Sequence, residues 1–108
     1  MTTPRAPAHL RPSTRRWWRQ IVDDYELGSH HLHLLTLAAE ALDRAEQARV
    51  LLEEAGSPVY VDRFGAPRKH PAVTVEETAR LQFARVVREL DLDAESLPPP
   101  RPPRRGGG

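Results

Sequence analysis

Three histidines stand close together in the first third of the chain, His30, His31 and His33. Imidazole nitrogens bind transition metals, and residues three apart share a helix face, so His30 and His33 could form a ligand pair. A metal site needs further ligands, and no cysteine or carboxylate occurs at a matching spacing. The segment is therefore interpreted as the polar first turn of a helix, and we expect no metal.

The chain offers no clear catalytic group. His70 precedes a proline and has no nucleophile beside it, so a role in bracing the start of a helix is favoured over proton transfer. The acidic residues are spread along helix faces rather than paired, and the glycines form no phosphate-binding loop. We expect a protein that is not an enzyme and needs no cofactor.

Arginine offers the clearest chemistry, because a planar guanidinium binds phosphate through its charge and through paired hydrogen bonds. The candidate DNA contacts are Arg5, Arg11, Arg15, Arg16, Arg19, Arg63, Arg68, Lys69, Arg101, Arg104 and Arg105. Such contacts would position DNA rather than read its sequence. The alternative is that arginines near the N-terminus, Arg19 above all, pair with Asp23, Asp24 or the acids of the next helix.

Charge is unevenly distributed, although the net charge is only +1. Residues 1–20 hold five arginines and no acid (+5), and residues 21–60 hold eight acids and two arginines (−6). Residues 61–75 add +2, residues 76–97 add −3 and residues 98–108 add +3. Basic ends and a basic connector thus flank an acidic body, which suits attraction to a nucleic acid, although charged tails are also common in other proteins.

A chain of 108 residues is enough for one small domain. Residues 1–12 carry three prolines and no acid, and residues 98–108 are PPPRPPRRGGG, so both are expected to be flexible basic arms around a helical domain of residues 13–97. A domain of about 80 residues buries only about 60% of its unfolded surface, which favours a homo-oligomer. Without cysteines or an apolar run of about 20 residues, a cytoplasmic protein without a membrane span is expected.

Apolar periodicity predicts three helices, of which the first spans residues 14–25 with Ser13 as its N-cap. Trp18 should lie in the core, and Trp17 at the core edge or against a neighbouring subunit. Across the three helices, the residues assigned to the core or to an oligomer interface are Trp17, Trp18, Leu34, Leu37, Ala38, Leu42, Leu52, Leu81 and Val87.

The second helix is expected over residues 30–55, with Ser29 as its N-cap and Gly56 ending it. Its apolar positions form one stripe at residues 34, 37, 38, 41, 42, 45, 48, 51, 52 and 55. Five of these ten are alanines, which let a neighbouring helix approach closely. The opposite face, including Asp43, should be solvated.

The connector after the second helix is predicted to hold a short strand at residues 59–61 and a turn at residues 62–65. His70-Pro71 opens the third helix, residues 72–90, although a capping box of Thr74 and Glu77 would start it slightly later. The main apolar stripe of this helix is Leu81, Ala84, Val87 and Leu90, widened by Phe83 and Val86. We expect an all-α, mainly helical fold: an antiparallel hairpin of the second and third helices, braced by the first, with a short β-hairpin or loop between them.

The order and spacing of these pieces over residues 7–97 resemble the small terminase subunit of tailed bacteriophages and their prophages. The matching residues are Pro7, Leu10, Trp18, Ile21, Tyr25, Leu34, Leu37, Ala38, Ala41, Leu42, Leu51, Leu52, Glu53, Gly56, Asp62, Gly65, His70, Pro71, Leu81, Val86, Val87, Leu90 and Leu92. One departure is Asp91, where the family often has glycine.

The resemblance implies a non-enzymatic DNA-recognition and regulatory component of the phage DNA-packaging motor. Such subunits form homo-oligomeric rings, bind double-stranded viral DNA, and regulate the large terminase subunit, which carries the ATPase and nuclease. The main alternative is a helical protein-interaction adaptor whose polyproline-arginine tail binds a partner. A weaker one is a metal-dependent DNA-processing enzyme that uses the HHLH segment.

Overall fold

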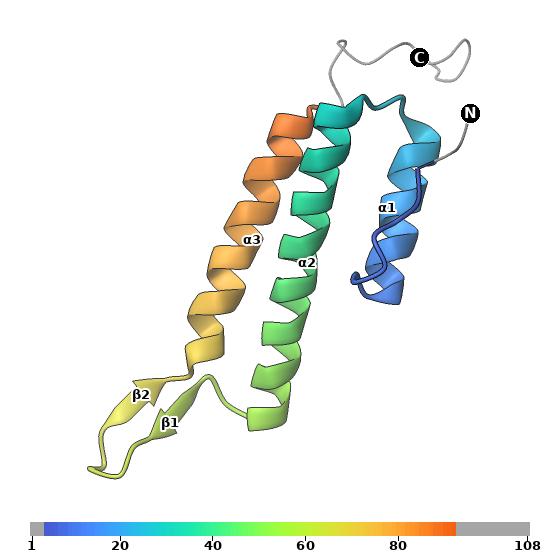
Figure 1. Cartoon of the computed structure of the whole chain (residues 1–108). Helices are drawn as coiled ribbons and strands as arrows, with labels where there is room; N and C mark the ends of the chain where they lie inside the picture. The colour runs from blue at the N-terminus through green and yellow to red at the C-terminus, as the bar shows by residue number, and fades with distance from the viewer. Residues whose placement is uncertain (1–3, 93–108) are drawn as a thin grey trace.

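The computed structural model describes residues 4–92. In this part of the chain the elements are α1 (Pro12–Asp24), α2 (Ser29–Ala55), β1 (Val59–Val61), β2 (Pro67–Lys69) and α3 (Pro71–Leu90). Helices α2 and α3 form an antiparallel hairpin, and α1 lies beside α2 (Figure 1). Strands β1 and β2 form a two-stranded antiparallel sheet, which projects from the end of the hairpin where α2 stops and α3 begins. The mainly helical architecture expected from the sequence is confirmed. No helix within the described residues is both long enough and apolar enough to cross a membrane.

Both serine caps predicted from the sequence are wrong. Helix α1 begins at Pro12 and has Arg11 as its N-cap, because proline has a suitable φ and no N–H to satisfy in the first turn. Helix α2 begins at Ser29 itself, with Gly28 as the N-cap. In neither helix does the side chain of the N-cap residue accept a hydrogen bond from the first turn.

The connector between α2 and α3 follows the sequence-based prediction closely. Helix α2 ends at Gly56, whose φ of 80° is left-handed and whose N–H reaches the carbonyls of Leu52 and Glu53. Helix α3 has Pro71 in its first position, and His70 caps it, since His70 Nδ1 accepts the N–H of Ala72 at 3.0 Å. The predicted capping box of Thr74 and Glu77 is wrong, because the helix has already begun at Pro71.

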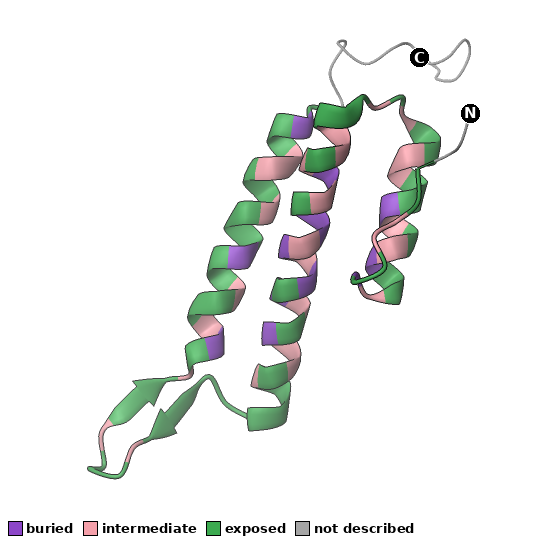
Figure 2. Ribbon diagram, viewed as in Figure 1, coloured by how far each residue is buried: buried purple, intermediate pink, exposed green. Residues whose placement is uncertain are grey.

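Two faces of α2 are buried, not one. Leu35 and Ala39, both 0% exposed, face the core cluster that also contains Trp18, Leu10 and Leu90. The second buried face is formed by the alanines at positions 38, 41, 45 and 48. Helix α2 packs along α3, and buried residues occur along both helices (Figure 2). The sequence-based prediction of a single stripe left out Leu35 and Ala39, because it assumed that α2 contacts other helices on one side only.

Several large apolar residues of the predicted stripes lie outside the core of the single chain. Leu37 and Leu51 on α2 are 53% and 52% exposed, and Leu81 on α3 is 68% exposed. The buried residues of α3 are Ala72, Ala79 and Leu90, and Ala84 is exposed, so the predicted main stripe of α3 is rotated from the real one. Small alanines mark the contact between α2 and α3, because they allow close approach of the two backbones.

The two tryptophans of α1 occupy different environments. Trp18 is 3% exposed in the core, as predicted, and its indole N–H donates to the Thr36 hydroxyl at 3.3 Å. Trp17 is half-buried at the core edge and contacts Phe83 of α3, with ring centroids 5.7 Å apart. This contact links α1 to α3 as well as to α2.

Candidate nucleic-acid interface

The segment before α1 is part of the packed structure. Leu10 is only 2% exposed and belongs to the core cluster, and its N–H donates to the carbonyl of Pro7 at 3.3 Å. His9 Nε2 also lies 2.9 Å from the Glu40 carboxylate of α2. Residues 6–11, expected from the sequence to belong to a flexible arm, are therefore packed against the helices, with Ala6 and Leu10 at the core and His9 beside α2.

A buried carboxylate holds the start of α1 against α2. Asp43, 8% exposed, accepts the backbone N–H of Arg11 at 2.9 Å and the hydroxyl of Thr14 at 2.5 Å. The prediction that Asp43 faces solvent is wrong, since α1 covers it. Its two hydrogen bonds offset the cost of removing a carboxylate from water.

Two of the candidate arginines near the N-terminus have partners inside the chain. Arg15 Nη1 donates to the carbonyl of Leu10 at 2.5 Å and to that of Ala8 at 3.2 Å, so this side chain holds the N-terminal segment. The Arg11 guanidinium lies 4.0 Å from the Glu46 carboxylate of α2. Pairing with the second helix was the alternative considered from the sequence, and the structure favours it for Arg11.

Three other arginines near the N-terminus are exposed. Within residues 4–92, Arg5, Arg16 and Arg19 have no carboxylate within 4.0 Å. Arg16 and Arg19 lie three positions apart on α1, so they share a helix face. These two guanidinium groups remain available to an external anion. The candidates Arg101, Arg104 and Arg105 lie outside the described residues.

The β-hairpin is organised around one aspartate. Asp62 Oδ1 accepts the N–H groups of Phe64 and Ala66, and Oδ2 accepts Nε–H of Arg68, each at 2.9 Å. Gly65 follows with a left-handed φ of 79°, which a residue without Cβ adopts at little cost. The register pairs Val59 with Lys69 across the two strands.

The hydrogen bond from Arg68 and those from the backbone lower the pKa of Asp62 below its ordinary range. The carboxylate is thus ionised at neutral pH, and its hydrogen bonds lie within the turn. Because Arg68 neutralises it, the remaining cations of the hairpin, Arg63 and Lys69, are not balanced by a local acid among the described residues.

The hairpin exposes several large apolar side chains. Val61 and Phe64 are 68% and 78% exposed, and Val59 and Tyr60 are about half exposed. The Arg63 guanidinium lies over the Phe64 ring, 4.9 Å from its centroid. The sequence-based prediction named the cations of this hairpin but not Phe64. An aromatic residue beside an arginine in a polar turn was the sequence signal that could have identified Phe64 as a candidate site residue.

The histidines near the start of α2 do not converge on a common point. His30 and His33 are exposed and His31 is half-buried; the rings of His30 and His31 meet edge to face, with centroids 5.6 Å apart. Among residues 4–92, no group of three or more histidines, cysteines or acids is arranged to hold a metal ion.

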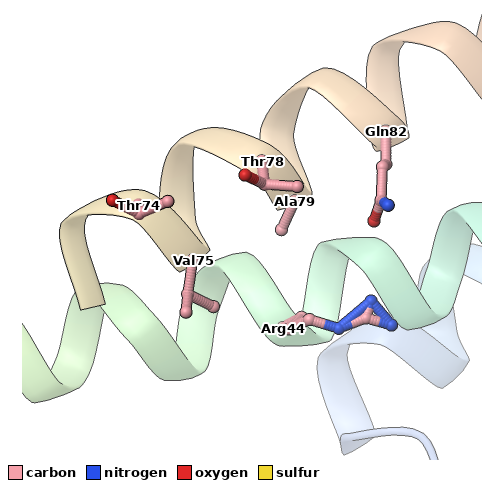
Figure 3. A pocket seen from close by; sticks show the side chains of 6 residues that line it. All are labelled: Arg44, Thr74, Val75, Thr78, Ala79 and Gln82. Carbon is pink, nitrogen blue, oxygen red and sulfur yellow. The ribbon is translucent and has the colours of Figure 1, made fainter. Parts of the chain in front are cut away.

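A shallow groove of about 340 Å³ runs between α2 and α3 (Figure 3). Val75 and Ala79 form its apolar part, and Arg44 of α2 lies across from Gln82 of α3. Thr74 and Thr78 complete the lining. No carboxylate, histidine or cysteine lines the groove, so it offers no general base and no metal ligand.

Comparisons of the chain with protein-family models, with curated proteins and with solved structures found no match.

Proposed function

We propose that this protein is a small terminase subunit, a non-enzymatic component that recognises double-stranded viral DNA and regulates the large terminase subunit in the bacterial cytoplasm. The sequence resemblance supports this proposal. So do the structural roles of its motif residues: Gly56 ends α2, Asp62 organises the turn, and His70 with Pro71 starts α3. These residues define the connector between α2 and α3.

The observation that carries the DNA-binding part is a set of exposed cations without carboxylate partners. Arg16 and Arg19 lie on α1, and Arg63 and Lys69 lie on the β-hairpin. Exposed guanidinium and ammonium groups without a carboxylate partner contact phosphates at little cost in free energy, since no ion pair must first be broken. A ring of identical subunits would multiply these few contacts into avidity.

Salt dependence of duplex binding tests this proposal. Binding of a fluorescent DNA duplex should weaken steeply as the salt concentration is raised. A plot of the logarithm of the binding constant against the logarithm of the salt concentration should have a slope of about −0.9 per phosphate contacted. The double variant R16A/R19A should bind more weakly and show a shallower slope. The matched control is R49A, because Arg49 is already paired with Glu46 and Glu53.

Absence of duplex binding even at low salt would overturn the proposal and favour the adaptor function. Equal losses in R16A/R19A and R49A would show that the exposed face of α1 is not the contact. The proposal is supported if the unchanged protein and R49A bind DNA with the expected slope while R16A/R19A binds more weakly and with a shallower slope.

A further inference from the structure

The apex of the β-hairpin combines features that the phosphate contacts do not explain. Phe64 is the most exposed large apolar side chain of the described residues, at 78%, and it stands beside Arg63 at the turn. Isolated apolar residues are common on protein surfaces, but this ring lies at the tip of a projecting hairpin, where a ligand can reach it.

The charge around Phe64 indicates the kind of partner. The only carboxylate of the turn, Asp62, is bound by Arg68 and by two backbone N–H groups, whereas Arg63, next to Phe64, is exposed without a carboxylate partner in the described chain. An aromatic ring beside an unbalanced cation is complementary to an aromatic polyanion. Nucleic acid has this chemistry, since each base is a flat ring and each linkage carries a negative charge.

The geometry allows stacking. The Arg63 guanidinium covers one face of the Phe64 ring, at 4.9 Å from the centroid, and the overall exposure of 78% leaves ring surface open to a ligand. The turn is held by three hydrogen bonds to Asp62, so the ring is presented by a pre-organised backbone. Little conformational freedom is then lost when a base stacks on it.

We propose that the hairpin apex is a nucleobase-stacking site, in which Phe64 packs against the face of a base while Arg63 contacts an adjoining phosphate. This inference rests on the proposed DNA-binding function and adds a base contact to it. The base comes either from a single strand or from a duplex step that Phe64 opens as a wedge; the chemistry at the ring is the same.

The test compares F64L with F64W and with the unchanged protein. Leucine keeps an apolar side chain but has no aromatic face, and tryptophan keeps the face. Because Phe64 is exposed, circular dichroism should show the same helix content in all three proteins. Affinity is measured by fluorescence anisotropy with a short single strand, a fully paired duplex, and a duplex with one mismatched step. A 2-aminopurine base in each probe reports stacking directly.

We expect F64L to weaken binding by about 5- to 100-fold, with the slope against salt unchanged, because stacking is lost while phosphate contacts remain. F64W should retain affinity, and the change in 2-aminopurine emission should vanish only in F64L. A larger effect on the single strand assigns the base to unpaired DNA, and a larger effect on the mismatched duplex assigns it to an opened step.

Three results would overturn the inference. If the protein binds DNA with the expected salt slope but F64L binds equally well, the stacking site is wrong and the proposed function stands. If F64L changes only the sedimentation of the protein, Phe64 contacts a second copy instead. If the unchanged protein binds none of the probes at low salt, the proposed function itself fails.

Discussion

A single buried carboxylate connects the N-terminal segment to the helical hairpin. Asp43 of α2 receives both the Arg11 N–H and the Thr14 hydroxyl, and no cation lies within 4.0 Å of it in the described chain. Arg15, one turn further along α1, holds the Leu10 and Ala8 carbonyls. These polar contacts fix the start of α1, and Arg16 and Arg19 are thereby placed on a defined surface.

Replacing Asp43 with alanine should destabilise the protein by about 1–3 kcal/mol, because a buried hydroxyl and a backbone N–H lose their acceptor. Urea denaturation measures this loss, and hydrogen exchange should show the largest increase in residues 10–15. The control is Glu53→Ala, which removes an exposed carboxylate paired with Arg49 and should cost less than about 0.5 kcal/mol. Equal stability of the two variants would show that Asp43 does not anchor α1.

At the scale of elements, the connector between α2 and α3 was predictable from sequence, whereas the N-caps of α1 and α2 and the two-sided packing of α2 were not. The end of α2 at Gly56, the turn at Asp62 and the start of α3 at His70 depend on neighbouring residues, so the sequence contains all the information needed. Leu35 lies on the α1 side of α2, and Leu10 precedes any helix. Their burial depends on where α1 folds back, which periodicity within one helix cannot indicate.

In the candidate site too, residue types were predictable from the sequence, whereas the contacts of individual side chains were not. The sequence identified the exposed cations Arg16 and Arg19 by residue type alone, but it could not separate them from Arg15, one position away, whose donors bind carbonyls of its own chain. Asp43 was assigned to solvent because an acid among polar helix positions usually is solvated. Only the position of α1 distinguishes it from the exposed acids of α2.

The β-hairpin should be the first element to lose order in acid. Arg68 and two N–H groups bind the ionised Asp62 and hold its pKa below its ordinary value of about 3.9. Since the folded pKa is the lower one, the stabilisation is present above the unfolded pKa and is lost as pH falls through the folded pKa. Amide protection of Phe64 and Ala66 should therefore decrease below about pH 4 in NMR exchange experiments, before helix content changes.

Asp62→Asn provides the control for this prediction. The amide side chain cannot titrate, so hairpin protection should be weaker at neutral pH and independent of pH between 3 and 5, a range chosen around the ordinary carboxyl pKa of about 3.9. An unchanged acid transition in this variant would assign the transition to another carboxylate.

At the scale of the molecule, the single chain leaves large apolar residues uncovered on the helical hairpin. Leu37 and Leu51 on α2 and Leu81 on α3 are each more than half exposed. Burial of a leucine contributes roughly 1.5–3 kcal/mol, so covering such residues with neighbouring copies would contribute substantially to the stability of so small a domain. Assembly and folding are therefore expected to be linked.

We predict that sedimentation velocity will show an assembly of several copies, and that the double variant L37E/L81E will sediment as a single chain. The charged side chains would be buried without partners at the interface, which costs several kcal/mol, but they remain solvated in the monomer. Helix content should persist, because neither leucine belongs to the core of one chain. Q47E, an added charge at another exposed position of α2, should leave assembly unchanged. A protein that remains a monomer at high concentration would contradict the ring, and the exposed cations would then act without avidity.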